Sequence, residues 1–217
     1  MIIFATTNPS KKANLLRVKE YSDYHILMLD EAMRVGIINK DVYQEPEETG
    51  TTYRQNALIK AKAAFDAITN GIHCSVMADD SGFEIEYLNG EPGIYSARLG
   101  GTKIQYNEKR HILMKKMHEK EVPYTERAVK FVCHCTLIDP LMGIHDVEST
   151  TCGFLPWPDL PDGLETPGNP YLRMLELPGL GNYDKLEPKL KSLLNYHEKA
   201  YREMMQLIKC IEGKDAD

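Results

Sequence analysis

Two adjacent acids, Asp79 and Asp80, follow a short apolar run and precede Ser81 and Gly82 in the stretch VMADDSG. Carboxylates are hard oxygen ligands that suit Mg²⁺, and beside a metal they can position or deprotonate a water molecule. Because successive strand residues point to opposite faces of a sheet, we expect a turn at Ser81-Gly82 that lets both acids face one ligand. An Asx-type turn that binds only nearby N–H groups fits the same stretch equally well.

Other polar groups in the chain complete the parts needed for phosphate chemistry. They are the segment TTNPSKK at 6–12, the acidic segment QEPEETG at 44–50, Asn56, Lys60 and Lys191. Together they supply a phosphate loop, oxygen ligands for Mg²⁺ and ammonium groups for a polyphosphate. The sequence contains neither a G-x-x-x-x-G-K-[ST] run nor a G-x-G-x-x-G run, so P-loop and Rossmann mechanisms have no support.

Alternating strands and helices must position these groups. Apolar runs predict strands, and apolar spacings of three or four residues predict helices. The predicted strands are 2–6, 24–29, 74–78, 83–88 and 127–138, and the predicted helices are 11–21, 52–68 (capped by Thr51 or Thr52), 103–120 and one from about 188. Segment 6–12 then joins a strand to a helix N-terminus, which favours anions. On the helix 52–68, Asn56 and Lys60 share one face. This order predicts an α/β fold with a mixed sheet.

Composition and charge restrict the class of protein. The 217 residues carry a net charge of −6, which argues against a nucleic-acid partner. The apolar run at the N-terminus is too short for a signal or membrane segment, so we expect a cytoplasmic protein with its five cysteines reduced. We expect one two-lobed domain over 1–212, a disordered tail at 213–217 and an irregular, proline-rich excursion at 155–170.

Four segments carry a resemblance to a known family. ATTNPSKKANL resembles the A-T-x-N-x-x-K opening of the inosine triphosphate pyrophosphatase family, and EETGTTYRQNALIKAKAA is similar to its E-E-T-G-x-T-F-x-E-N-A-x-x-K-A segment. ADDSGFEIEYLNGEPGIYSARLGG is similar to the family signature A-D-D-S-G-L-x-V-x-x-L-x-G-x-P-G-x-Y-S-A-R-x-x-G, and RAVKFVC fits a later strand. The resemblance is close over the first half of the chain.

The resemblance implies a fold, a reaction and a set of roles. The fold would be an elongated mixed sheet flanked by helices, with two lobes, a central cleft and a homodimeric assembly. Water would attack the α-phosphorus of a nucleoside triphosphate with Mg²⁺ bound, Mn²⁺ being an alternative, and would release a monophosphate and pyrophosphate. The implied metal ligands are Glu47, Glu48 and Asp80, the catalytic residues Asp79, Asp80 and Lys60, and the phosphate-binding residues Thr6, Thr7, Asn8, Lys11, Asn56 and Ser81.

The second half of the chain departs from the family in the segments that, in the family, recognise the base. GNPYLRML stands at 168–175 in place of G-F-G-Y-D-P, and the S-H-R motif aligns with Asn195, Tyr196 and His197. The remaining candidates for base contact are Tyr171, Lys191, Tyr196 and His197. Because a buried polar site rejects bases that lack its partners, we expect retained hydrolysis with altered or relaxed base choice. The alternative for Tyr196 and His197 is ordinary helix surface.

Further alternatives stay open from the sequence. The function would be hydrolysis of an aberrant purine nucleotide, hydrolysis of a different nucleotide, or nucleotide binding without turnover. Cys133, His134 and Cys135, with Cys152 nearby, suggest a soft-metal site, but alternation places His134 on the opposite face, which favours buried small side chains. Trp157 would cap a base pocket or anchor its loop.

Overall fold

The computed structural model describes residues 1–19, 24–101, 106–155 and 170–212. The predicted tail at 213–217, Trp157 and most of the proline-rich segment lie outside these residues. The helices are α1 Pro9–Lys19, α2 Leu29–Arg34, α3 Tyr53–Asp66, α4 Tyr106–Glu119, α5 Pro188–Leu194 and α6 Tyr196–Ile211. The strands are β1 Ile2–Phe4, β2 Ile26–Met28, β3 Ser75–Ile85, β4 Pro92–Gly93, β5 Ala128–Asp139, β6 Gly143–Phe154, β7 Glu176–Leu177 and β8 Gly181–Asn182. Short 3₁₀ helices lie at Glu86–Leu88, Tyr124–Glu126, Pro170–Met174 and Tyr183–Lys185.

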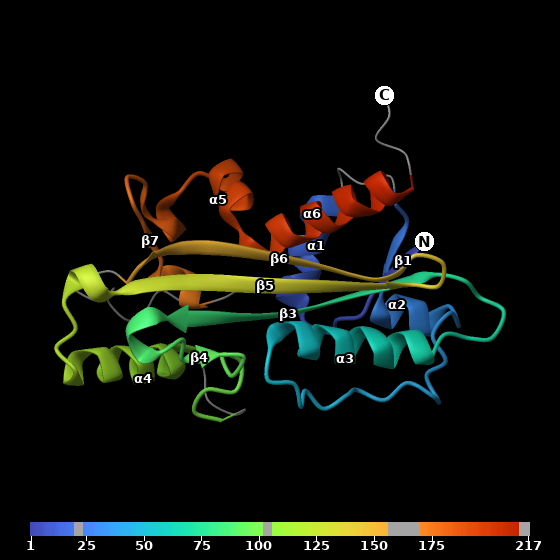
Figure 1. Cartoon of the computed structure of the whole chain (residues 1–217), viewed down its shortest axis with the longest axis horizontal. Helices are drawn as coiled ribbons and strands as arrows, with labels where there is room; N and C mark the ends of the chain where they lie inside the picture. The colour runs from blue at the N-terminus through green and yellow to red at the C-terminus, as the bar shows by residue number, and fades with distance from the viewer. Residues whose placement is uncertain (20–23, 102–105, 156–169, 213–217) are drawn as a thin grey trace. The chain divides into compact units, whose positions relative to one another are not determined.

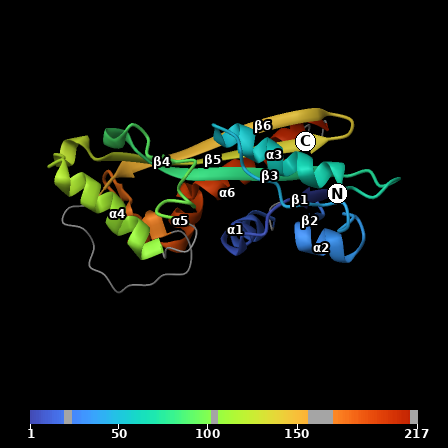
Figure 2. The ribbon, with the colours of Figure 1, turned by 90° about the horizontal axis from the view of Figure 1, so that it is seen from below.

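The described strands form one mixed sheet with helices around it, as Figure 1 shows. The strand order is β2-β1-β3-β5-β6-β7-β8, and β4 pairs with β3. β1 is parallel to both β2 and β3, and these three strands lie side by side near the amino terminus (Figure 2). The predicted mixed α/β fold is confirmed.

The chain divides into two compact units. The first comprises Met1–Ser81, Cys133–Ser149 and Tyr196–Asp217, and the second comprises Gly82–Val132 and Thr150–Asn195. Among the described residues, no helix combines the length and the apolar character that crossing a bilayer requires.

One face of the sheet in the first unit packs against α2 and α3. Ile3, Val76 and Ala78 point to this face and form one buried cluster with Ala61 and Ala64 of α3. Because the side chains of these alanines are small, the backbone of α3 approaches the strands closely. That approach brings the polar side chains of α3 to the strand ends.

The opposite face packs against α1 and α6, and α3 and α6 lie on opposite sides of the strands in Figure 1. The ring of Phe4 meets the ring of Tyr201 edge to face, with centroids 5.2 Å apart. Arg17 of α1 and Glu198 of α6 form an ion pair of 2.6 Å between Nε and Oε1. Asp79 of β3 therefore lies toward α1 and α6, and Asp80 lies toward α3.

The strand β3 corrects the predicted turn at Ser81-Gly82. It runs without interruption from Ser75 to Ile85, and the expected second strand at 83–88 ends in the 3₁₀ helix Glu86–Leu88. Asp79 and Asp80 therefore point to opposite faces, as in any strand. No turn is needed because each carboxylate meets a lysine on its own face.

The last predicted helix is two helices. Asn195 has an extended conformation, with φ −68° and ψ 117°, and separates α5 from α6. α5 buries no residue, and the side chain of Leu193 is exposed. α6 carries the buried stripe, which includes Ala200, Tyr201 and Met204. The apolar positions Leu190, Leu194, Tyr201 and Met204 keep helical spacing across residue 195, so the sequence pattern does not signal the break.

Other boundaries differ by a few residues. Thr52 caps α3, since its Oγ1 accepts a hydrogen bond of 3.2 Å from the Gln55 amide, but the helix ends at Asp66 rather than at 68. Leu29, predicted as the end of the second strand, begins α2.

The second unit has an aromatic core. The ring centroids of Phe83 and Phe131 lie 4.8 Å apart. The ring of Phe83 also stacks on that of Tyr171, with centroids 5.2 Å apart and planes inclined by 10°. α4 packs on the 3₁₀ helix Pro170–Met174.

Candidate active site

The predicted phosphate loop forms the junction of β1 and α1. Asn8 caps the helix, because its Oδ1 accepts hydrogen bonds of 2.9 Å from the Ser10 amide and 3.4 Å from the Lys11 amide. The Asn8 amide in turn donates to Thr6 Oγ1 at 3.2 Å, and the side chain of Thr7 is exposed. The first turn of α1 and its partial positive charge are thus held at the carboxyl end of β1, where a phosphate group is favoured.

Asp79 lies on the α1 face and is paired with Lys11. The Lys11 ammonium is 2.9 Å from Asp79 Oδ2 and donates to the Asp79 carbonyl oxygen at 3.3 Å. Burial alone would raise the pKa of Asp79, but Lys11 first, and then His197 and Lys60, lower this pKa below its ordinary value. Burial opposes the charge of Lys11, yet the carboxylates of Asp79 and Asp80 raise its pKa above the usual range. Both groups are therefore charged at neutral pH.

His197 of α6 closes the same face. Its Nε2 lies 3.1 Å from Ser81 Oγ and 3.8 Å from Asp79 Oδ2. The Cys133 thiol lies beside them and donates to Asp79 Oδ2, with Sγ 3.6 Å away. Burial lowers the pKa of His197 to about 3, with Asp79 opposing this effect and Lys11 adding to it. The imidazole is therefore neutral at pH 7.

Asp80 lies on the α3 face within a separate polar cluster. Lys60 Nζ is 3.1 Å from Asp80 Oδ1 and 2.9 Å from Glu48 Oε1. Asn56 Nδ2 donates to Asp80 Oδ2 at 3.1 Å. The predicted shared face of Asn56 and Lys60 is confirmed, since both side chains hold one carboxylate.

The acidic segment 44–50 is held to this cluster by Gly50. The Gly50 amide donates to Asn56 Oδ1 at 2.9 Å. A Cβ at Gly50 would lie 2.6 Å from Asn56 Oδ1 and 2.7 Å from Gln55 Cβ, so only glycine fits the position. Among the described residues, Glu48 is the acid of this segment that reaches Lys60, and the side chain of Glu47 is exposed.

The donor set of the α3 face fits a hard divalent cation. Glu48 and Asp80 offer carboxylate oxygens to one shared positive group, Lys60, as they would to Mg²⁺. On the other face, donor atoms of Asp79, Cys133 and His197 lie within 4.8 Å of one another. That mixture of oxygen, sulfur and nitrogen donors suits softer metals and does not fit Mg²⁺.

The two clusters meet at one strand end although they lie on opposite faces. β1 pairs with β3 up to Phe4 opposite Met77, and the Ala5 amide donates to the Met77 carbonyl at 2.8 Å. Residues 78–81 of β3 thus extend past the carboxyl end of β1, beside the phosphate loop. Ligands of parallel sheets bind at such strand ends, where groups from both faces reach one bound molecule.

Of the four residues predicted to contact a base, Tyr171 and Lys191 belong to the second unit. Tyr171 is buried, stacks on Phe83 and donates through its hydroxyl to the Ser96 carbonyl at 3.0 Å. Lys191 Nζ donates to the Asp184 carbonyl at 2.5 Å. These contacts tie both side chains to their own unit, and their contact with a base stays a prediction.

Tyr196 and His197, in the first unit, are not ordinary helix surface. They are 1% and 6% exposed, and their ring centroids lie 4.1 Å apart. Exposed positions of a helix would not be packed in this way, so the surface alternative is wrong. Base contact by either residue remains untested.

The cysteine-rich strand does not form the soft-metal site considered from the sequence. Cys133 and Cys135 are buried, whereas His134 points to the other face. There its ring nitrogens lie 3.1 Å from Asp146 Oδ1 and 3.4 Å from Glu148 Oε2. The reading as buried small side chains is confirmed. Sequence alternation predicted the face of Cys133, but gave no signal that Asp79 lies beside its thiol.

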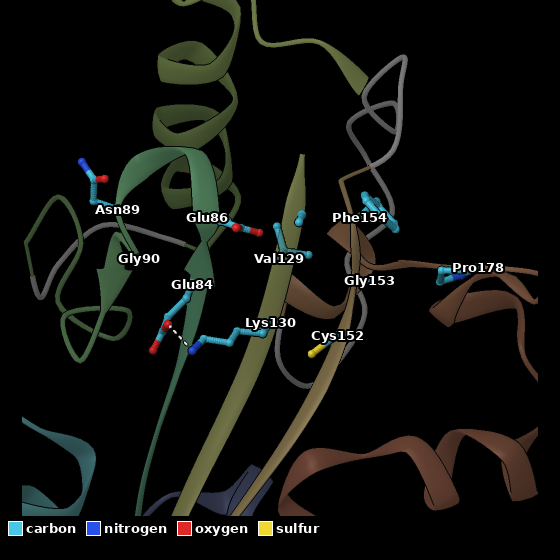
Figure 3. Close-up of a pocket in the computed structure, with 11 residues that line it drawn as sticks. Glu84, Glu86, Asn89, Gly90, Val129, Lys130, Cys152, Gly153, Phe154 and Pro178 are labelled. Atoms are coloured by element: carbon cyan, nitrogen blue, oxygen red, sulfur yellow. Dashed lines mark ion pairs between the residues drawn. The ribbon is translucent and has the colours of Figure 1, made fainter. Parts of the chain in front are cut away.

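A cavity of about 640 Å³ lies in the second unit (Figure 3). Its lining includes Val129, Phe154 and Cys152, together with Glu84 and Lys130, which pair at 3.0 Å. No residue predicted for the site lines it. The candidate active site therefore remains the strand end of the first unit.

Comparison with known proteins shows the family. A sequence model of the Ham1 family matches residues 2–207. The chain belongs to the Ham1 family. It is 40% identical over 140 residues to a Dictyoglomus thermophilum protein named dITP/XTP pyrophosphatase, a match covering 64% of this chain and 61% of that protein. It is 35% identical over 152 residues to a Staphylococcus aureus protein of the same name, covering 70% of this chain and 69% of the relative.

Solved structures of related proteins share the fold. The Staphylococcus aureus Ham1 protein has a TM-score of 0.75 at 26% identity, covering 97% of this chain and 98% of that one. A Mycobacterium abscessus structure described as a nucleoside-triphosphatase and dITP/XTP pyrophosphatase has a TM-score of 0.68 at 28% identity, covering 94% and 97%. The resemblance inferred from the four segments is confirmed by this family membership.

Proposed function

We propose that this Ham1 chain hydrolyses a noncanonical purine nucleoside triphosphate, such as one carrying hypoxanthine or xanthine, to a monophosphate and pyrophosphate. One structural observation carries the proposal. Asp80, bonded to Asn56 and Lys60 beside Glu48, lies at the strand end that also holds the phosphate loop. The names of the two relatives support this substrate class.

Each side chain has a role that its position supports. Lys11 and the first turn of α1 bind phosphate oxygens, and Lys60 holds the Asp80 carboxylate in place through their ion pair. Glu48 and Asp80 would hold Mg²⁺, with Mn²⁺ as the alternative and Glu47 at the exposed edge of the same segment. When bound, the metal would lower the pKa of water and offset charge on the phosphates. Asp80 accepts the proton of the attacking water.

The charge arrangement favours turnover over simple nucleotide binding. Asp79, Asp80 and Glu48 are acids close to a proposed triphosphate, and acids repel phosphate unless cations accompany them. Two lysines and a divalent ion supply that compensation. We also propose, from the family resemblance, a cytoplasmic homodimer.

Base choice is proposed to be altered or relaxed. The residues aligned with S-H-R are Asn195, Tyr196 and His197, and all three are buried. A change in the hydrogen-bond donors and acceptors of a buried site changes the ratio of kcat/KM between bases by orders of magnitude. A pyrophosphatase for another nucleotide is therefore the second candidate function.

A panel of nucleoside triphosphates, assayed for pyrophosphate release with Mg²⁺, tests the proposal. We expect release from inosine or xanthosine triphosphate, and loss of at least about 100-fold in kcat for Asp80→Asn, because the amide neither accepts a proton nor binds the metal well. Asp41→Asn, at an exposed position of the same unit, is the matched control and should keep the native rate. Release from other bases alone would favour the second candidate. No release from any nucleotide would refute hydrolysis.

A further inference from the structure

His197 has a contact that the base-reading role does not explain. Asp79 and Ser81 are two residues apart on β3 and point to the same face. His197 Nε2 faces both, at 3.1 Å from Ser81 Oγ and 3.8 Å from Asp79 Oδ2. The ring of Tyr196, 4.1 Å away, and that of Tyr201, 6.1 Å away, pack beside the imidazole and fix its orientation.

The protonation state of the ring decides the direction of the bond to Ser81. Burial keeps His197 neutral at pH 7, so one ring nitrogen carries a proton and the other carries a lone pair. A lone pair on Nε2 would face the negative Asp79 carboxylate, whereas an N–H there is attracted to it. Nε2 therefore carries the proton and donates to Ser81 Oγ.

This direction leaves the Ser81 hydroxyl proton available. A hydroxyl has one proton and two lone pairs, and the His197 N–H occupies a lone pair. Ser81 is half-buried next to Asp80, at the strand end proposed to bind phosphate. A hydroxyl whose rotation is fixed in this way donates to a phosphate oxygen with less loss of freedom.

We propose that His197 is a positioning residue, which orients the Ser81 hydroxyl toward a phosphate oxygen of the substrate and does not read the base. The inference rests on the proposed function, since it assigns Ser81 to the same triphosphate. Base choice in this chain then depends on other residues, and a substitution of His197 affects every accepted base alike.

Kinetics of four variants test the inference: His197→Ala, His197→Gln, Ser81→Ala and the double variant His197→Ala with Ser81→Ala. We expect His197→Ala to lower kcat/KM about 10-fold for every accepted base, the equivalent of one lost hydrogen bond. The ratio between bases should change less than about 2-fold. In the Ser81→Ala background, His197→Ala should add little, because the two groups act as a unit.

A conservative variant and a surface control separate positioning from packing. The amide N–H of His197→Gln reaches toward Ser81 as Nε2 does, and it should recover most of the lost rate. His73→Ala, at an exposed position, should leave the kinetics unchanged. If circular dichroism shows that His197→Ala does not fold, the kinetics of His197→Gln and Ser81→Ala are compared with those of the wild type instead. A base ratio that shifts more than about 5-fold in either His197 variant would overturn the proposal.

A spectroscopic measurement does not depend on activity. In protein labelled with ¹⁵N-histidine, the His197 ring should show a proton on Nε2, and its Nε2 signal should shift in Ser81→Ala. An unshifted signal, or a proton on Nδ1 instead, would overturn the inference even if the wild-type enzyme hydrolysed its substrate. A wild-type protein without pyrophosphatase activity that still showed the shift would refute the proposed function alone, leaving the Ser81 contact in place.

Discussion

Lys11 and Lys12 are neighbours in sequence with different electrostatic surroundings. Lys11 pairs with fully buried Asp79, while Lys12 pairs on the surface with Asp30 at 3.4 Å and Glu31 at 3.9 Å. A buried pair cannot lose one partner without leaving an uncompensated charge, whereas an exposed pair contributes little. The two lysines are therefore a matched comparison within one helix turn.

Replacement of each lysine by methionine should separate the two cases. We expect Lys11→Met to lower the free energy of unfolding by about 3 kcal/mol or more, because Asp79 is left charged and buried. Lys12→Met should lower it by less than about 1 kcal/mol. Urea unfolding at pH 7 measures both. Equal losses would show that Asp79 is not compensated by Lys11.

The sequence predicted which side chains lie together better than the directions in which they point. Thr6, Asn8, Lys11, Asn56, Lys60, Asp79, Asp80 and Ser81 were named from motifs and do gather at one strand end. The placement of the two acids on opposite faces was missed, because it depends on lysines distant in sequence. The burial of Tyr171 was missed for the same reason, since its partners Phe83 and Ser96 are far along the chain.

Among the elements, β3 and α6 show where local patterns fail. A Ser-Gly pair is a common turn signal, but flanking pairs of β3 with β1 and β4 keep the strand extended through it. The break at Asn195 has no glycine or proline beside it, and the apolar spacing continues across it, so no local pattern predicts it. The helix start at Thr52 was predictable because its capping interaction is local.

The loop before α3 offers a test of how an element positions a catalytic group. Gly50→Ala places a Cβ against Asn56 Oδ1, so Asn56 must move and loosen its bond to Asp80. We expect kcat to fall about 10-fold or more and stability to fall by about 1–2 kcal/mol. Steady-state kinetics and urea unfolding measure the two effects. Thr49→Ala, exposed in the same loop, should change neither, and an unaffected Gly50→Ala enzyme would contradict the positioning role.

For the whole molecule, His197 couples folding to pH. Its pKa falls from an ordinary 6.5 to about 3 in the folded chain, so the unfolded chain binds a proton more readily between these values. Unfolding then takes up one proton at His197, and stability falls as the pH falls from about 6.5 toward 3. The other lowered values, those of Asp79, Asp139 and Asp146, add stability that is lost only at more acidic pH.

The contribution of His197 to the pH dependence of stability can be isolated by comparing wild type with His197→Gln. Between about pH 6 and 4, we expect the unfolding free energy of the wild-type protein to fall about 1.4 kcal/mol more per pH unit than that of His197→Gln. Urea unfolding of both proteins at half-unit intervals of pH gives the two slopes. Parallel curves would mean that His197 is protonated in the folded chain.

Because Asp79 and Asp80 point to opposite faces of β3, the site also depends on the number of residues in this strand. Deleting one residue from the middle of this strand would move every later side chain of β3 to the opposite face of the sheet. The Ser81 hydroxyl would then face Lys60 of α3, where the Asp80 carboxylate lies now. Lys60 would then lose its carboxylate partner on β3, whereas Lys11 would face Asp80 in place of Asp79. The number of residues along this stretch is therefore a requirement of the site in addition to the identities of Asp79 and Asp80.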